Sequence, residues 1–480
     1  MDLSSLLFLL QLLSHSNTQQ PGKTPENPAS FIITDCGNGS KCKEVSGGLT
    51  IDANWRATYV MSQDQQQKNY CNDGGAWTSV CSGSGEECAK TCMIDGTENY
   101  AETYGVLSTA KGSITMRFST QSMRMARTLV LGCTSLRAAG TGTTCSSLKT
   151  GNLNLMLMCQ NCHVVSKELY TSHPWSRMVV NQNTQAMWQG EKYGTGYCDA
   201  KCPKDIKWVE GQANIKGWKA DGEGSGKGDM GVCCPEMDVW EANSFAQAFT
   251  SHTCNPLTSK VCTGDQCGDT SANRYNGFCD KDGCDFASYR FGAQDFYGQG
   301  KKLDTSKKFT VITQFITQGN TNKGELIEVR RMYLRQDGTL IQNEPVKVQG
   351  LDKKADSLTD KFCQANKDIT KDQNSFKEHG GMKAMGQAMK NGMVLVMSIM
   401  DDKEDKMQWL DGIYPPNGSV DKYGVKQGPC DPNSGDRQNI LTGNPAAEVV
   451  FSNVKIGPIK NPTTANKPTG IKQKRSTYHI

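Results

Sequence analysis

The 480-residue chain lacks several features that would point to particular functions. After residue 16 it has no apolar run long enough to cross a bilayer, so no membrane partner is expected. Asp280-Lys281-Asp282-Gly283 lacks the remaining ligands of a calcium loop and is interpreted as a turn. No Pro/Ser/Thr-rich linker or further binding domain follows residue 460, because the tail at 461–480 is short and basic. We therefore expect no metal and no cofactor.

The amino terminus and the cysteines indicate an oxidising compartment. Residues 1–16 are typical of a signal peptide, since the apolar run Leu3–Leu13 is too short for a membrane span, although Asp2 departs from the usual positive charge. Twenty-one cysteines predict a disulfide framework. Asn38 and Asn417 begin glycan-acceptor sequences. We expect a secreted, extracellular glycoprotein.

Hydrophobic patterning predicts the fold class. Most of the chain alternates apolar and polar residues between turns rich in Gly and Asn, as strands of a sandwich do. An all-β domain can reach this length without dividing. The sequence therefore predicts a single domain over residues 17–460, followed by the tail at 461–480.

The most informative motif is the stretch Cys233–Asn243, which reads CCPEMDVWEAN. It places the carboxyls of Glu236, Asp238 and Glu241 within six residues, beside Trp240. Neighbouring carboxyls beside an aromatic ring, in a disulfide-rich chain, predict acid–base or nucleophilic chemistry on a neutral, ring-shaped substrate such as a sugar.

Strand geometry makes a further demand on this motif. On a regular strand Glu236, Asp238 and Trp240 would share one face, and Glu241 would point away from it. A retaining glycosidase needs its two carboxyls roughly 5–5.5 Å apart. We therefore expect the strand to bulge or bend before Glu241, as strands near active sites often do.

The Cys233–Asn243 stretch resembles the active-site strand of glycoside hydrolase family seven, the cellobiohydrolases and endoglucanases. The resemblance covers residues 30–458 and extends to five further motifs: Asp52–Arg56, Tyr193–Cys198, Gly211–Asn214, Phe296–Gly298 and Phe451–Val454. It implies a concanavalin-like β-jelly-roll sandwich of two large antiparallel sheets, whose long loops form a substrate tunnel.

The resemblance also implies roles for individual residues. Glu236 matches the nucleophile, Glu241 the general acid/base, and Asp238 the residue that tunes the nucleophile. The expected substrate-binding residues are Trp55, His252, Arg274, Arg290 and Trp409, with His252 beside the acid/base. The implied disulfides are 36–42, 71–92, 81–88, 198–234, 202–233, 254–279, 262–267 and 284–363, which leaves Cys430 without its family partner.

Residues 122–190 differ from the rest of the chain. They contain six Lys/Arg against one acidic residue, Glu168, and without them the net charge falls from +4 to −1, so no nucleic-acid partner is expected. Read one nucleotide earlier, permitted codons allow family-like strings that include the missing partner cysteine, in L-P-C-G. We interpret the segment as an out-of-frame translation, with a diverged insertion as the alternative. The haem-like motif at Cys159–His163 lies inside it and is discounted.

Three functions remain open on this evidence. The loops at 261–289, 346–380 and 411–430 favour a cellobiohydrolase over an endoglucanase of the same family. Ala57 and Met400 stand where the family carries tryptophan platforms, which predicts weaker grip at distant subsites. A non-catalytic, lectin-like glucan-binding protein is the third reading, although binding alone needs no paired carboxyls. We expect a monomer acting on cellulose, and the chain as written to be inactive if the frame is shifted.

Overall fold

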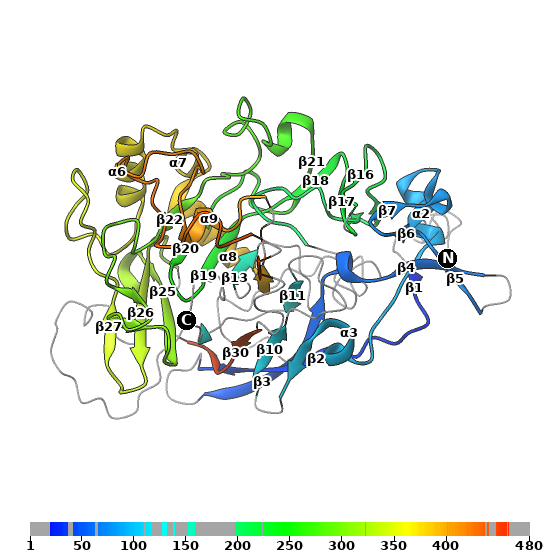
Figure 1. Ribbon diagram of the computed structural model, residues 1–480, viewed down its shortest axis with the longest axis horizontal. Coiled ribbons are helices and arrows are strands. Elements are labelled where there is room, and N and C mark those ends of the chain that lie inside the picture. Colours follow the sequence, from blue (N-terminus) through cyan, green and yellow to red (C-terminus); the bar gives the residue numbers. More distant parts are fainter. Residues whose placement is uncertain are drawn as a thin grey trace, which may run out of the picture.

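A computed structural model provides the structure of the protein (Figure 1). It describes residues 20–36, 42–62, 66–109, 112–117, 127–131, 138–139, 152–158, 197–222, 224–321, 323–400, 402, 404–436, 439–440, 448–457 and 459. Strands dominate these residues, and helices are few and short. The all-β prediction is therefore confirmed.

A nine-stranded sheet forms the main layer and carries the acidic motif. Its order is β22-β20-β19-β13-β29-β11-β3-β2-β31, antiparallel except where β2 meets β31. In the same order the strands span Cys284–Phe286, Gln247–His252, Glu236–Ala242, Asn152–Met158, Val394–Met400, Arg127–Leu131, Lys43–Ile51, Ala29–Asp35 and Val454–Ile456. The acidic strand β19 therefore has a neighbour on each side.

Two four-stranded sheets contribute to the same core. One has the order β12-β30-β10-β9, with strands Ala138–Ala139, Glu448–Phe451, Ile114–Arg117 and Val106–Ser108. The other has the order β25-β26-β27, with β28 also paired to β26, and its strands are Phe309–Thr317, Leu326–Arg335, Leu340–Gln342 and Ser357–Leu358. Buried residues of all three sheets form one hydrophobic cluster, exemplified by Met237, Phe451 and Tyr333. The layers thus share one core, as a sandwich requires.

Shorter strands lie around this sandwich. They are β1 Gln20–Pro21, β4 Thr58–Met61, β5 Lys68–Tyr70, β6 Asn72–Asp73, β7 Ala76–Trp77, β8 Met93–Ile94, β14 Trp208–Val209, β15 Gln212–Ala213, β16 Lys219–Ala220, β17 Gly226–Lys227, β18 Met230–Cys233, β21 Lys260–Thr263, β23 Tyr297–Gly298 and β24 Leu303–Asp304. Figure 1 shows β16, β17 and helix α2 at the opposite side of the molecule from β25–β27.

Some of the helices occur where the sequence predicted a long loop. The α-helices are α2 Gly85–Thr91, α3 Tyr100–Tyr104, α6 Asp360–Thr370, α7 Ser375–Glu378, α8 Gly381–Asn391 and α9 Gln408–Asp411, with 3-10 turns η1 Ala53–Trp55, η2 Ser79–Cys81, η4 Gly264–Cys267 and η5 Gln318–Asn320. The expected loop at 346–380 is thus partly helical. The side chain of Thr359 caps α6 by accepting from the Phe362 N–H, a start signal that the sequence contains.

All eight disulfides implied by the resemblance are present. The expectation that Cys430 lacks a bridge is wrong, because Cys430 is disulfide-bonded too. The framework ties neighbouring loops together: Cys202–Cys233 and Cys198–Cys234 hold the segment before β19.

The segment 122–190 contributes more to the fold than the sequence suggested. Its described residues form β11, β12 and β13, and β13 pairs with both β19 and β29. These stretches therefore take part in the main sheet and in one of the four-stranded sheets, while the reading-frame hypothesis stays a prediction. The haem-like motif at 159–163, the glycan sequence at Asn38, the signal peptide and the tail at 461–480 lie outside the described residues. Within the described part of the chain, every helix is too short or too polar to traverse a bilayer.

Candidate active site

A β-bulge in β19 arranges the three carboxyls. On the β20 side Asp238 lies opposite Thr250 and Glu241 opposite Ala248, so three steps along β19 match two along β20. On the β13 side the register skips Val239. Because side chains alternate along a strand, one extra residue returns Glu241 to the face that carries Glu236 and Asp238. The bulge predicted from the sequence is therefore present.

The same bulge sends Trp240 to the opposite face, where the sequence did not place it. Its ring makes edge-on contacts with Tyr297, Phe309 and Tyr333 in the hydrophobic core. The expectation that Trp240 shares a face with the carboxyls is wrong, because it assumed a regular strand. Trp240 serves the core instead of the carboxyl face.

Glu236 is held by main chain and by its neighbour. The side chain is 2% exposed, and one carboxyl oxygen accepts from the Ala200 N–H at 2.8 Å. Burial, together with the charge of Asp238, raises its pKa to about 8, even though His252, Lys201 and the Ala200 N–H favour the anion. Glu236 thus has fixed donors that favour its ionised form.

Asp238 joins Glu236 to His252. The His252 Nε2 lies 3.2 Å from Asp238 Oδ2, and its Nδ1 lies 2.9 Å from the Asp280 carbonyl. Since a carbonyl only accepts, Nδ1 carries a hydrogen and the ring is fixed in one orientation. Burial raises the pKa of Asp238, while a hydrogen bond to Glu236 lowers it. His252 therefore contacts Asp238, and its expected place beside the acid/base Glu241 stays a prediction.

Glu241 is the carboxyl best suited to hold a proton. It accepts a hydrogen bond of 3.2 Å from the Thr250 hydroxyl. Burial raises its pKa well above the usual range, and the charges of Asp238 and Glu236 raise it further. Three buried carboxyls cannot all be ionised together, and the proton stays where the compensating donors are fewest. The arrangement offers one carboxylate and one carboxylic acid on a single face.

Sequence reasoning missed several groups around these carboxyls. Asp199 is buried, and its burial together with the charge of Glu236 raises the pKa of its carboxyl. The Tyr197 hydroxyl donates to this carboxyl at 2.8 Å. Tyr197 belongs to the Tyr193–Cys198 motif and Asp199 follows it, so the motif could have drawn attention to both. Thr250 lies two residues before His252 on β20 and therefore on the same face, so strand periodicity could have found it. The charge of Lys201 favours the ionised form of all three carboxyls.

The two predicted tryptophan platforms lie partly buried. Trp55 ends η1 and packs against the main core. Trp409 lies in α9, packs against a cluster that includes Ala248 of β20, and donates from Nε1 to Asp402 at 3.0 Å. Ala248 is the residue opposite Glu241, so Trp409 lies near the bulge. Both residues are therefore partly exposed, and the hydrogen bond to Asp402 orients the ring of Trp409.

The two predicted arginines are paired with aspartates. Arg274 contacts Asp282 through Nε at 2.7 Å and Nη2 at 2.6 Å, and its side chain is 41% exposed. Arg290 pairs with Asp285 and lies over the ring of Phe291. Asp285, the partner of Arg290, lies opposite Thr250 on the neighbouring strand. Since Thr250 donates to Glu241, this pairing connects Arg290 to the carboxyl face. These aspartates fix guanidinium groups that retain further donors.

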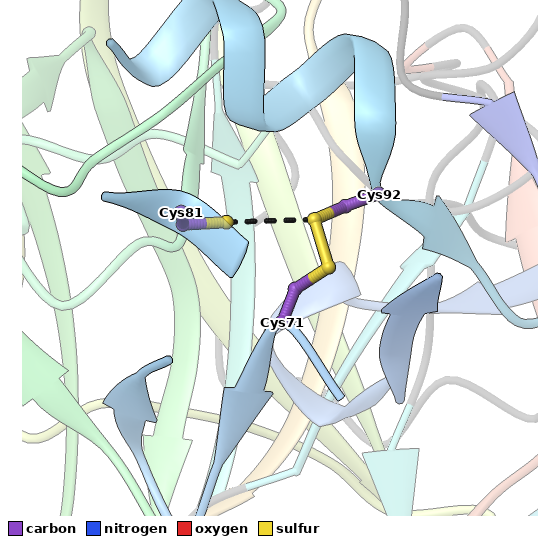
Figure 2. A group of neighbouring side chains, drawn as sticks. All are labelled: Cys71, Cys81 and Cys92. Atoms are coloured by element: carbon purple, nitrogen blue, oxygen red, sulfur yellow. Dashed lines mark hydrogen bonds between the residues drawn. A yellow bond between two sulfur atoms is a disulfide. The ribbon is translucent and has the colours of Figure 1, made fainter. Parts of the chain in front are cut away.

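Two groups of neighbouring cysteines do not form metal sites. Figure 2 shows Cys71, Cys81 and Cys92, and a second group contains Cys202, Cys233 and Cys262. Cys71 is bonded to Cys92, and Cys81 to Cys88. The second group is likewise bonded, as Cys202–Cys233 and Cys262–Cys267. Neither group offers the thiolates that a metal would need.

The chain is similar to known cellulases over almost its whole length. The model of glycosyl hydrolase family 7 matches residues 21–463. A family 7 cellobiohydrolase from Daphnia pulex is 37% identical, with a TM-score of 0.79, covering 92% of this chain and 99% of that one. A cellobiohydrolase from Melanocarpus albomyces, solved with cellotetraose, is 34% identical, with a TM-score of 0.73 and coverages of 92% and 98%.

An endocellulase from Humicola insolens is also similar, at 28% identity and a TM-score of 0.69, covering 92% of this chain and 99% of that one. The family match, the sandwich and the carboxyl strand agree with one another. The chain belongs to glycosyl hydrolase family 7 and is a glycoside hydrolase.

Proposed function

We propose that this protein is a secreted cellobiohydrolase that releases cellobiose from β-1,4-glucan chains with retention of anomeric configuration. The observation that carries the proposal is the bulge at Val239, which gives Glu236, Asp238 and Glu241 a common face. Binding alone requires no such arrangement, so the lectin-like alternative is disfavoured.

The proposed mechanism is a double displacement. Glu236 attacks the anomeric carbon while Glu241 gives its proton to the departing glycosidic oxygen, and a covalent glycosyl-enzyme forms. Glu241, now ionised, takes a proton from the water that displaces Glu236. Asp238 orients Glu236 through their hydrogen bond, and His252 orients Asp238. The Ala200 N–H and the charges of Lys201 and His252 favour the ionised form of Glu236.

The substrate is proposed to be a single glucan chain. Trp55 and Trp409 would stack on sugar rings, and Arg274 and Arg290 would bind hydroxyls beyond the point of cleavage. Ala57 is exposed where the family carries an entrance tryptophan, so the entrance grip should be weaker by on the order of 1 kcal/mol.

An endo-acting enzyme is the second candidate, because an endocellulase lies among the similar structures. The segment Val261–Tyr289, with its own Cys262–Cys267 disulfide, favours the exo mode, since endoglucanases of the family lack most of it. Release of soluble sugar from crystalline cellulose, measured against viscosity loss in a substituted soluble cellulose, separates the modes. Rapid viscosity loss with little soluble sugar would favour the endoglucanase.

The assignment of Glu236 is tested by substitution. Glu236→Gln should lower turnover by at least about 10³-fold and leave cellulose binding unchanged, because it removes the nucleophile and little of the binding surface. Glu404→Gln, on a side chain that is 82% exposed, is the matched control and should keep full activity. Nuclear magnetic resonance should show the β-anomer as the first product, and an initial α-anomer would contradict the assignment.

A further inference from the structure

The bulge that aligns the carboxyls leaves a main-chain group in need of a partner. Val239 is the extra residue of β19 and stands outside the register with β13. A bulged residue disrupts the hydrogen-bond ladder locally, and a buried carbonyl without a donor is costly. Some other group must therefore supply the donor at this point.

Arg331 supplies that donor from the opposite sheet. It lies in β26, paired with Thr313 of β25, and its Nη2 donates to the Val239 carbonyl. The side chain is fully buried, at 0% exposed. Its contact thus crosses the core from one layer of the sandwich to the other.

Two aromatic faces enclose the guanidinium. The Arg331 Cζ lies 4.4 Å from the ring centre of Phe249 on β20 and 5.0 Å from that of Trp240 on β19. Burial lowers the pKa of Arg331 to about 10, so the group is still charged at neutral pH. Arginine suits such a place because it is weakly hydrated and stacks on aromatic rings.

The contact holds the part of the strand between the two reacting carboxyls. Val239 lies after Glu236 and Asp238 and before Glu241, so its peptide sets the offset between nucleophile and acid. We propose that Arg331 is a positioning residue that fixes the bulge and thereby aligns Glu241 with the leaving glycosidic oxygen. This inference rests on the proposed role of Glu241 as general acid.

The strand offers a matched control beside it. Arg330 lies next to Arg331 on the same strand, but it donates to Glu328 through Nε at 2.8 Å and Nη2 at 2.7 Å. Its side chain is 15% exposed, and its neighbour in the ladder is Gln314. Arg330→Met therefore removes the same charge from β26 without touching the bulge.

The test uses aryl β-cellobiosides with two leaving groups and the purified full-length enzyme. Phenolate leaves with a proton from the general acid as the bond to the anomeric carbon breaks, whereas 2,4-dinitrophenolate leaves unaided. Arg331→Met should lower kcat/KM for the phenyl substrate about 10- to 100-fold and for the dinitrophenyl substrate less than about 3-fold. Arg331→Lys, which restores a donor, should recover part of the loss, and Arg330→Met should change neither value.

A purely structural role for Arg331 predicts an effect on kcat/KM that does not depend on the leaving group. Equal losses on both substrates, or no loss on either, in Arg331→Met would overturn the inference. If Arg331→Met does not fold, the same criterion is applied to Arg331→Lys. Glu241→Gln, measured in parallel, must show the same leaving-group dependence. If Glu241→Gln lowers both values equally, the proposed role of Glu241 fails, and that outcome is distinct from a failure of Arg331 alone.

Discussion

Burial sets the protonation of the three carboxyls on β19. It is the largest cause of the raised pKa of Glu236, Asp238 and Glu241. A carboxyl whose pKa is higher in the folded state keeps its proton after the unfolded chain has released its own. Stability from such a group is therefore full below the unfolded pKa of about 4.5 and falls as the pH rises toward about 8 for Glu236.

This linkage predicts that Glu236→Gln stabilises the protein in a pH-dependent way. The gain should be near zero at pH 4.5 and reach on the order of 1–3 kcal/mol at pH 8, because glutamine has no proton to lose. Thermal unfolding of both forms across this range measures it. The exposed control Glu404→Gln should show a flat difference. A gain for Glu236→Gln that shrinks as the pH rises would contradict the burial argument.

At the scale of elements, two loops meet behind the carboxyls. The Lys281 ammonium donates to the Lys201 carbonyl at 2.7 Å and to Asp269 at 2.6 Å, and the Lys201 ammonium donates back to the Lys281 carbonyl. The residues next to this lysine pair hold the site: the Ala200 N–H binds Glu236, and the Asp280 carbonyl binds His252. The pair thus joins the supports of nucleophile and histidine.

We expect Lys281→Met to lower kcat on a soluble cellobioside about 10-fold, since small displacements of reacting groups are costly. Lys307→Met, which removes an ammonium 67% exposed and paired with Asp304, is the control and should behave as the parent enzyme. Initial rates at saturating substrate provide the measurement. An unchanged kcat in Lys281→Met would show that the two loops hold their positions without the lysine pair.

At the scale of the whole molecule, the segment 122–190 lies where core strands are needed, since β13 separates β19 from β29. The total stability of a protein is about 5–15 kcal/mol, and the loss of stability caused by an unrelated sequence in these layers would exceed it. We therefore expect the frame-restored chain to be secreted and active and the chain as written to be inactive.

Peptide mapping of native enzyme tests the same hypothesis. Cys430 is disulfide-bonded, and in the active protein its partner should be the cysteine of an L-P-C-G peptide. Mass spectrometry of a non-reduced tryptic digest would find this linked pair. Recovery of the peptide Glu168–Arg177 from active secreted protein would refute the frame hypothesis.

The sequence by itself determined the fold class, the disulfide pairs and the acidic motif. Alternation along strands is a local property, so periodicity predicted an all-β chain, and the resemblance supplied the eight described disulfides. The spacing of Glu236, Asp238 and Glu241 even required a bulge, because only an extra residue restores a common face.

Only the tertiary structure decided which groups surround that motif. The bulge depends on two neighbouring strands, so its effect on Trp240 and its partner Arg331 could not be read from β19 alone. His252 contacts Asp238 because β20 pairs in a particular register. Such contacts join residues as far apart as 92 positions, and chain folding, which no local pattern encodes, brings them together.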